Sequence, residues 1–285
     1  MTAAPRLLVA DLPRRGLMGI VNVTPDSFSD GGTYLDADAA VRHGLALAAA
    51  GAAVIDVGGE STRPGAEPVD EDEELRRVLP VVRALVERGP TPVSIDTTKA
   101  AVADAALGAG AAMVNDVSGG AADRGMLAVV AGAGAAYVAM HMRGTPRTMQ
   151  QDTHYSDVVR DVGEELRRRV ERAIDAGVDA RALLADPGIG FAKTAEQNVA
   201  LLRALPEVAA RAGVPLLVGT SRKSFLSRIA LVDDRPGRDD ATLATTVWCF
   251  ERGAALVRVH DVAGSRRAVE LLETLEHATS QGMAA

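Results

Sequence analysis

The sequence is poor in cysteine and in aromatic residues, and each shortage excludes a class of protein. Cys249 is the only cysteine among 285 residues, so no internal disulfide can form and a disulfide-stapled secreted domain is excluded. Aromatic residues make up 3% of the chain, so alanine, valine and leucine must fill the core. A core of small aliphatic side chains favours helices layered against parallel strands.

Long apolar runs and excess positive charge are missing as well. No apolar stretch reaches the ~20 residues that a membrane-spanning helix needs without meeting a charge or a glycine. The first 16 residues lack the apolar core of a signal peptide. The net charge of −7 offers no broad basic surface for nucleic acid, although local arginines and lysines can still bind a small anion. We therefore expect a soluble, cytoplasmic protein that binds neither membrane nor nucleic acid.

The chain repeats one pattern along its length: a short apolar run, a polar end and then a helical stretch. Residues 7–10 are predicted to form an edge strand before this pattern begins. The predicted strands that follow cover residues 17–21, 52–57, 91–95, 112–114, 135–140, 183–185, 215–218 and 254–259. The predicted helices between and after them cover residues 35–51, 71–88, 100–107, 124–131, 155–176, 194–205, 238–252 and 264–279.

Eight alternating strand and helix units predict an α/β fold, a single (β/α)8 TIM barrel. No linker or shift in composition divides the chain, so residues 1–285 are predicted to form one domain with its core at about 17–280. A doubly wound open sheet is the competing fold. It is disfavoured because no G-x-G-x-x-G motif follows the first predicted strand.

Polar residues recur where these predicted strands end. In a barrel the carboxyl ends of all strands meet at one face, where active sites form. Each residue alone has an ordinary explanation, since an aspartate after a strand usually caps a helix and a lone histidine is usually satisfied by the backbone. Their recurrence in nearly every unit favours a site. The residues are Asn22, Asp56, Asp96, Asn115, His141, Asp186, Lys223, Arg258 and His260.

The chemistry of this set indicates its ligands. Asp96, Asn115 and Asp186 offer carboxylate and amide groups that suit a flat heterocycle with amino, imino and lactam groups. Cationic donors for a phosphate come from Arg63, Arg258 and His260. The amide of Asn22, with nearby acidic loop residues, suits Mg²⁺ held on a diphosphate. Zinc-binding spacings, a Walker loop and a nucleophile elbow are all missing from the sequence.

Eight motifs carry a resemblance to a known family. In chain order they are NVTPDSFSDGG, VIDVGGESTRPGA, VSIDT, VNDVSGG, MHMRGTPRTMQ, LADPGIGFAK, SRKSF and RVHDV. Together they span about residues 17–263, and the chain resembles bacterial dihydropteroate synthases. This resemblance implies condensation of 6-hydroxymethyl-7,8-dihydropterin diphosphate with p-aminobenzoate, which gives 7,8-dihydropteroate and pyrophosphate in folate synthesis. It also implies Mg²⁺ as cofactor, sulfonamides as inhibitors and a homodimer.

The resemblance also implies a role for individual residues. Catalytic roles fall to Asp96, Lys223 and Arg63, with Asp26 and Asp30 on the first loop. The pterin would be held by Asp96, Asn115, Asp186 and Lys223, with Met140 lining its slot. The diphosphate would be held by Arg258, His260 and, through Mg²⁺, Asn22. The p-aminobenzoate and sulfonamide site would comprise Thr62, Arg63, Pro64, Ser224, Phe28 and Phe191.

Three other functions compete with this interpretation. A pterin-binding homologue without catalytic activity is disfavoured because Lys223, Arg258, His260 and both loops, residues 22–32 and 58–70, are intact. A pterin-dependent methyltransferase barrel would need neither the STRPG loop nor the RVH segment. A generic barrel for phosphorylated sugars would have no use for the carboxylates and amide that suit a heterocycle.

Overall fold

The computed structural model describes residues 6–24, 33–63, 65–232 and 234–281. Eight parallel strands form one sheet in the order β6-β5-β4-β3-β2-β1-β8-β7. A parallel bridge between Ala185 and Leu216 brings β6 against β7, so the sheet is a nearly closed barrel. The strands are β1 (Gly16–Asn22), β2 (Val54–Gly58), β3 (Val93–Asp96), β4 (Met113–Asp116), β5 (Ala136–Met140), β6 (Leu183–Asp186), β7 (Leu217–Gly219) and β8 (Leu256–Val259).

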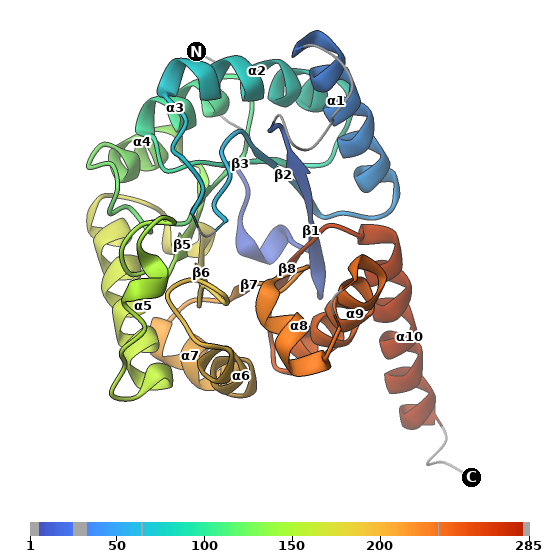
Figure 1. Ribbon diagram of the computed structural model, residues 1–285. Helices are drawn as coiled ribbons and strands as arrows, with labels where there is room; N and C mark the ends of the chain where they lie inside the picture. Colours follow the sequence, from blue (N-terminus) through green and yellow to red (C-terminus); the bar gives the residue numbers. More distant parts are fainter. Residues whose placement is uncertain (1–5, 25–32, 64, 233, 282–285) are drawn as a thin grey trace.

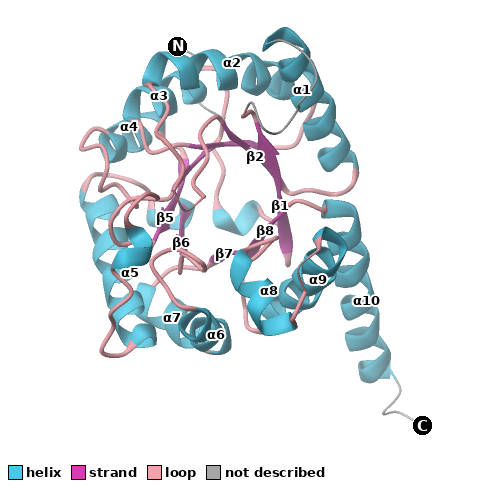
Figure 2. Ribbon diagram, in the orientation of Figure 1, coloured by secondary structure: helices cyan, strands magenta, loops and turns pink. Residues whose placement is uncertain are grey.

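Helices surround the sheet in chain order, as Figures 1 and 2 show. None of those within the described ranges is long and apolar enough to cross a membrane. The α-helices among the described residues are α1 (Thr33–Ala49), α2 (Glu71–Arg88), α3 (Ala100–Gly108), α4 (Met126–Ala133), α5 (Val158–Asp175), α6 (Ala195–Arg203), α7 (Leu205–Ala212), α8 (Ser224–Ala230), α9 (Arg235–Glu251) and α10 (Val262–Gln281). Short 3-10 helices are η1 (Val9–Asp11), η3 (Met149–Gln151) and η4 (Ala180–Ala182).

The predicted (β/α)8 barrel is confirmed, while the predicted edge strand at residues 7–10 is wrong. That segment leads into the 3-10 helix η1 instead. Leu7, Leu8, Val9 and Leu12 pack against inward-facing apolar side chains of the strands. These residues are apolar because they close the amino end of the barrel, and they do not form a strand of the sheet.

Two helices, α7 and α8, have no counterpart among the predicted elements. Helix α7 carries Pro206 in its first turn, where the missing N–H would be unpaired in any case. A proline in that place reads from sequence as the end of the preceding helix. Helix α8 spans only Ser224–Ala230, which is too short for a periodic pattern.

Alternation along the strands divides the barrel interior into two layers. Met18 of β1 pairs in register with Val54 of β2, and two residues further on Ile20 pairs with Asp56. Since side chains alternate between the two faces of a strand, these residues all face inward. The layer at the amino ends is apolar and includes Met18, Val54, Met113, Leu184 and Leu217. The layer at the carboxyl ends is polar.

Candidate active site

The strand register brings the predicted site residues onto one inner wall. Asn22 pairs with Gly58, Gly58 with Asp96, and Asp96 with Asn115, which makes a continuous row across β1 to β4. Further along the sheet Met140 of β5 pairs with Asp186 of β6, and Gly219 of β7 pairs with Arg258 of β8, the strand next to β1. The row explains why strand ends far apart in sequence supply a single site.

Four of these residues form a hydrogen-bonded cluster that we call the inner network: Asp56, Asp96, Asn115 and Arg258. The Arg258 guanidinium donates from Nε to Asp56 Oδ2 at 2.6 Å and from Nη2 to Asp96 Oδ2 at 2.7 Å. Asn115 Nδ2 donates to the same Asp56 oxygen at 3.0 Å. Asp56 Oδ1 is buried and has no hydrogen-bond partner among the described residues. The inner network therefore has an unused acceptor inside the barrel.

Burial sets the electrostatics of the inner network. It raises the pKa of Asp96 to about 7, against the opposing effect of Arg258 and with support from the negative charge of Asp56. Burial alone would lower the pKa of Arg258, but Asp56 and Asp96 more than offset it and the pKa is raised. Buried carboxylates of this kind are stabilised by a ligand that presents N–H donors.

Lys223 and Asp186 extend the polar wall toward β6 and β7. Lys223 Nζ donates to the carbonyl of Ile189 and lies 4.6 Å from the centroid of the Phe191 ring. Burial lowers the pKa of Lys223 to about 8, although Asp186 opposes the shift. Asp186 is buried and accepts a hydrogen bond from Gly188 N at 2.7 Å, and burial raises its pKa despite Lys223.

An apolar cluster lies beside these polar groups. Met140 and Phe191 belong to it, and both are almost fully buried. Its remaining members are Val117, Met142, Met149 and Ala192. An apolar wall next to carboxylates and an amide is the lining that a flat, hydrogen-bonding heterocycle requires.

His260, which the sequence predicts as a cationic donor, has a lowered pKa in the structure. Burial, followed by the nearby charges of Arg222 and Arg258, lowers its pKa to about 3, so the imidazole is neutral at pH 7. Its Nδ1 lies 2.9 Å from Ser221 Oγ. A neutral imidazole still offers one N–H to an anion, but it adds no positive charge.

The loop after β2 is fixed at its base and exposed further along. Lys99 forms ion pairs with Glu60 and Glu74, and Arg77 donates to the carbonyl of Gly59 at 2.9 Å. Beyond this base, Thr62 is half-buried, Arg63 is exposed, and Gly65 N donates to the Pro146 carbonyl at 3.2 Å. Ser224 is exposed at the first residue of α8. The predicted Asp26, Phe28, Asp30 and Pro64 lie outside the described residues.

His141 turns away from the site into a second cluster. Its Nε2 lies 2.9 Å from Glu165 Oε2 and its Nδ1 lies 3.0 Å from Lys193 Nζ. We call His141, Glu165 and Lys193 the outer network. Because Met140 faces inward, the next residue must face the helices, and this period-two rule predicts the orientation of His141. Asp56 is one of the strand-end candidates, without a predicted role of its own, whereas Lys193 and Ser221 are not among them.

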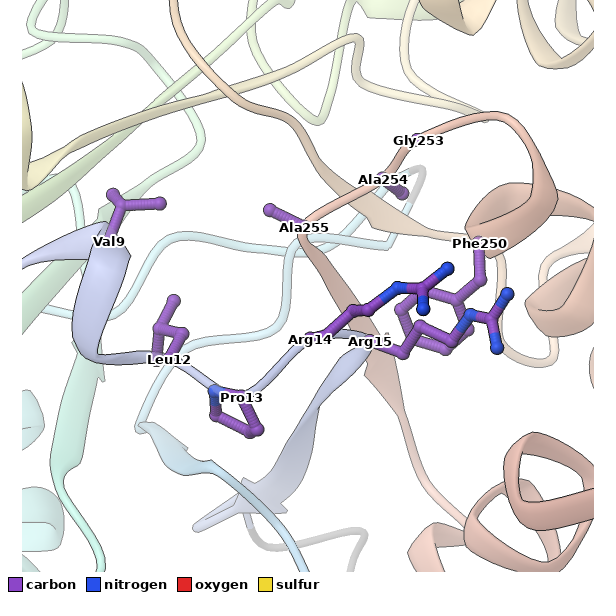
Figure 3. A pocket seen from close by; sticks show the side chains of 9 residues that line it. All are labelled: Val9, Leu12, Pro13, Arg14, Arg15, Phe250, Gly253, Ala254 and Ala255. Carbon is purple, nitrogen blue, oxygen red and sulfur yellow. The ribbon is translucent and has the colours of Figure 1, made fainter. Parts of the chain in front are cut away.

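A cavity of about 350 Å³ lies far from this site, next to the amino ends of β1 and β8 (Figure 3). It is lined by residues 9 and 12–15 on one side and by residues 250 and 253–255 on the other. Its position at the opposite end of the barrel separates it from the inner network, so we do not assign the reaction to it.

Known proteins are similar to this chain in both sequence and fold. The family of pterin binding enzymes matches residues 18–260. A dihydropteroate synthase of Mycobacterium leprae is 51% identical over 271 residues, which cover 93% of this chain and 95% of the relative. The structure of a Xanthomonas albilineans dihydropteroate synthase with 4-aminobenzoic acid has a TM-score of 0.86 and 46% identity, covering 93% of this chain and 94% of that chain. A Yersinia pestis dihydropteroate synthase in a sulfonamide drug complex has a TM-score of 0.87 and 41% identity, over 98% and 99% of the two chains. This chain therefore belongs to the pterin binding enzymes and, among them, to the dihydropteroate synthase family.

Proposed function

We propose that this chain transfers the pterin methylene group of 6-hydroxymethyl-7,8-dihydropterin diphosphate to the amine of p-aminobenzoate, which yields 7,8-dihydropteroate and pyrophosphate. The observation that carries the proposal is the inner network, in which two buried aspartates and an asparagine line a barrel mouth beside an apolar wall. The relatives named above support the same activity.

The pterin occupies the inner wall in this proposal. Asp96, Asn115 and Asp186 accept and donate the hydrogen bonds of its amino and lactam groups, Lys223 reaches the ring from the loop between β7 and α8, and Met140 lines the slot. A carboxylate recognises an amidine-like pair of N–H groups in a bidentate manner. The raised pKa values of Asp96 and Asp186 support this assignment, because bound N–H donors would stabilise both carboxylates.

The reaction separates charge, and the proposed residues stabilise both sides. Cleavage of the methylene carbon–oxygen bond leaves positive charge on the pterin and negative charge on pyrophosphate. Asp96 stabilises the first, while Arg63, Arg258 and the N–H of His260 stabilise the second. An aniline amine is nucleophilic at neutral pH, so no strong general base is required, and the proton that the nitrogen loses when the carbon–nitrogen bond forms passes to water or to the departing pyrophosphate. Asp26 and Asp30, on the loop after β1, are proposed to close over the site.

Mg²⁺ is proposed to bind together with the diphosphate. Among the described residues no group of three or more His, Cys, Asp or Glu side chains could hold a metal ion. Asn22 offers one amide oxygen at the carboxyl end of β1, in the same row as Asp96. This donor fits an ion that takes its other ligands from phosphate oxygens and water. Bound there, Mg²⁺ would neutralise charge on the leaving group.

The arylamine site is proposed to lie between two loops. Phe191, beside Lys223, would pack against the ring of p-aminobenzoate, with Thr62, Arg63 and Ser224 around it and Phe28 and Pro64 completing the pocket. Sulfonamides, which share the aniline group, are proposed to compete for this pocket. The Yersinia pestis relative, solved in a sulfonamide drug complex, supports the assignment.

Pyrophosphate release tests the proposed activity. Purified protein is supplied with pterin diphosphate and Mg²⁺, with and without p-aminobenzoate. We expect release that requires p-aminobenzoate and Mg²⁺ and that a sulfonamide blocks. Pterin binding without release would overturn the proposal in favour of a non-catalytic pterin-binding protein. Transfer of a methyl group from a pterin would instead indicate the methyltransferase alternative.

A homodimer in the cytoplasm completes the proposal. Ile229, Leu231 and Trp248 are exposed apolar side chains on or next to α8 and α9, and Leu231 is 90% exposed. Burial of these side chains against a second copy would remove them from water. The presence of a single cysteine, buried in α9, suits a reducing compartment. Sedimentation of the purified protein tests the dimer.

A further inference from the structure

The loop between β6 and α6, residues 187–194, is held by side chains at every carbonyl from residue 188 to residue 192. Lys193 Nζ donates to Gly188 O at 3.0 Å and to Phe191 O at 2.8 Å. The other three donors come from distant parts of the chain: Lys223 to Ile189 O, Gln150 to Gly190 O and Tyr155 to Ala192 O. Lys193 is thus the only one of these four side chains that holds two of the five carbonyls.

The backbone of this loop requires such support. Gly188, Gly190 and Ala192 all have positive φ angles, of 65°, 85° and 51°. The conformation of Ala192 is strained, because its φ lies in the left-handed region that a Cβ disfavours. A Cβ on Gly188 would lie 1.9 Å from the carbonyl oxygen of His141. A strained loop in close contact with a strand keeps its shape only when its surroundings determine it.

The hydrogen bonds of Lys193 form a complete set. Glu165 can only accept from His141 Nε2, because hydrogen bonds from His141 and Arg143 overcome the effect of burial and hold the pKa of Glu165 well below its usual range. Burial, followed by the charge of Lys193, lowers the pKa of His141 to about 3, so its imidazole is neutral, and with the proton on Nε2 the Nδ1 carries a lone pair and accepts from Lys193 Nζ. An ammonium has three N–H groups, and the two carbonyls and this nitrogen are three acceptors. Burial lowers the pKa of Lys193 well below its usual range, although Asp186 opposes the shift, and these three acceptors match the three N–H groups of the ammonium form.

We propose that Lys193 is a positioning residue that fixes the β6–α6 loop and, through it, the Phe191 ring against which the arylamine substrate packs. Lys193 is only 3% exposed and faces the helices, so it does not touch the substrate. It acts through the Phe191 carbonyl from outside the barrel, while Lys223 contacts Ile189 O and the Phe191 ring from inside. The inference rests on the proposed function, which assigns Phe191 to p-aminobenzoate.

The test compares Lys193→Met with the wild type and with Arg15→Met. Arg15 is also a buried cation, 5% exposed and paired with Glu251 and Glu276, but it lies next to the amino end of β1. Substitution there removes a similarly buried charge away from the site. If Lys193→Met does not fold, Lys193→Gln keeps two amide donors and takes its place.

The first measurement is amide hydrogen exchange of residues 187–194, which requires no substrate. We expect about tenfold faster exchange in this loop in Lys193→Met, with unchanged rates for the strands, and no change in the loop in Arg15→Met. The second is steady-state kinetics. We expect the KM for p-aminobenzoate to rise about tenfold, and the KM for pterin diphosphate to stay at its wild-type value.

Two results would overturn the role of Lys193: unchanged exchange in the loop, or equal increases in the KM of both substrates. The proposed function fails separately, through lack of p-aminobenzoate-dependent release by the wild type. In that case the exchange measurement still decides whether Lys193 holds the loop.

Discussion

Two buried charge networks lie on opposite faces of the barrel wall, and they differ in completeness. In the inner network Asp56 Oδ1 has no hydrogen-bond partner, and the neighbouring inward-facing Ser94 Oγ also has none among the described residues. In the outer network His141, Glu165 and Lys193 satisfy one another and the loop carbonyls. The inner network is thus open to a ligand, whereas the outer one is closed.

The difference shows how burial serves two purposes. A buried polar group without a hydrogen-bond partner destabilises the folded protein. Such a group is tolerated in a binding site, because the ligand supplies the missing hydrogen bond. A complete network rigidifies the structure around it. We infer that inner residues determine binding and chemistry, while outer residues determine how precisely the loops are placed. The variants below test this division.

Arg258→Met should have the largest effect, because it leaves two buried carboxylates without their counter-charge. Loss of one partner from a buried ion pair costs about 3–5 kcal/mol, and the anion-binding role would be lost with it. Urea denaturation measures the first effect and pyrophosphate release the second. In Asp56→Asn/Arg258→Met we expect most of the stability to return without the activity. A double variant no more stable than the single one would contradict this account.

Asp96→Asn should abolish most turnover while the protein stays folded. The amide cannot carry the negative charge proposed to stabilise the developing pterin cation, and loss of such a contribution costs about 10²–10³-fold in kcat. Stability should change little, since Arg258 keeps its ion pair with Asp56 and the substitution removes a carboxylate that burial disfavours. Single-turnover kinetics and a thermal melt test both expectations. Wild-type turnover in this variant would remove Asp96 from the mechanism.

The pH dependence should follow Asp96, whose pKa is raised to about 7. Its ionised form is proposed to bind the pterin, so kcat/KM for pterin diphosphate should fall about tenfold per unit below that pH. The contribution of Asp96 to the free energy of unfolding changes with pH in the opposite direction to the activity. The unfolded chain, with an ordinary pKa of 3.8, loses this proton first, so the contribution decreases as the pH rises from about 4 to about 7.

Asp56→Asn provides the control for this profile. The negative charge of Asp56 helps to raise the pKa of Asp96, so its removal should move the acidic limb to lower pH. Ionisation of the substrates is common to both proteins and does not contribute to the difference. If the acidic limb of the kcat/KM profile stays at the same pH in Asp56→Asn, a group other than Asp96 controls that profile.

Much of the fold and part of the site could be predicted from the sequence. Alternation of apolar runs with helical segments is a local pattern, and it identified the barrel. The carboxyl ends of barrel strands meet at one face, and this rule predicts from sequence alone that Asp96, Asn115 and Arg258 lie close together. The structure confirms that proximity through the inner network, while the roles of its members stay predictions.

The remaining features depend on contacts that no local pattern encodes. Asp56 reads as an ordinary strand-end aspartate, and its place in the inner network follows only from pairing with Arg258, 202 positions away. The role of Lys193 depends on His141, 52 positions away. His260 is neutral because of burial and two nearby arginines, which are properties of the folded state. Helix α7 is not predicted from the sequence, because Pro206 is read as the end of the helix before it. In the structure Pro206 lies in the first turn of α7.

Tyr137→Phe should have the smallest effect and gives the strictest test of the division between the two faces. Tyr137 faces the helices from β5, and its hydroxyl donates to Asp116 Oδ2 at 2.8 Å. Asp116 also accepts from Ser118 N, Ser118 Oγ and Gly120 N, so it keeps three donors when the hydroxyl is removed. We expect a loss of about 1 kcal/mol in the free energy of unfolding and no change in kcat/KM. Urea denaturation and pyrophosphate release measure the two quantities. A tenfold loss of activity at this outward-facing residue would mean that the outer face controls chemistry directly, and the separation of roles between the two faces would then fail.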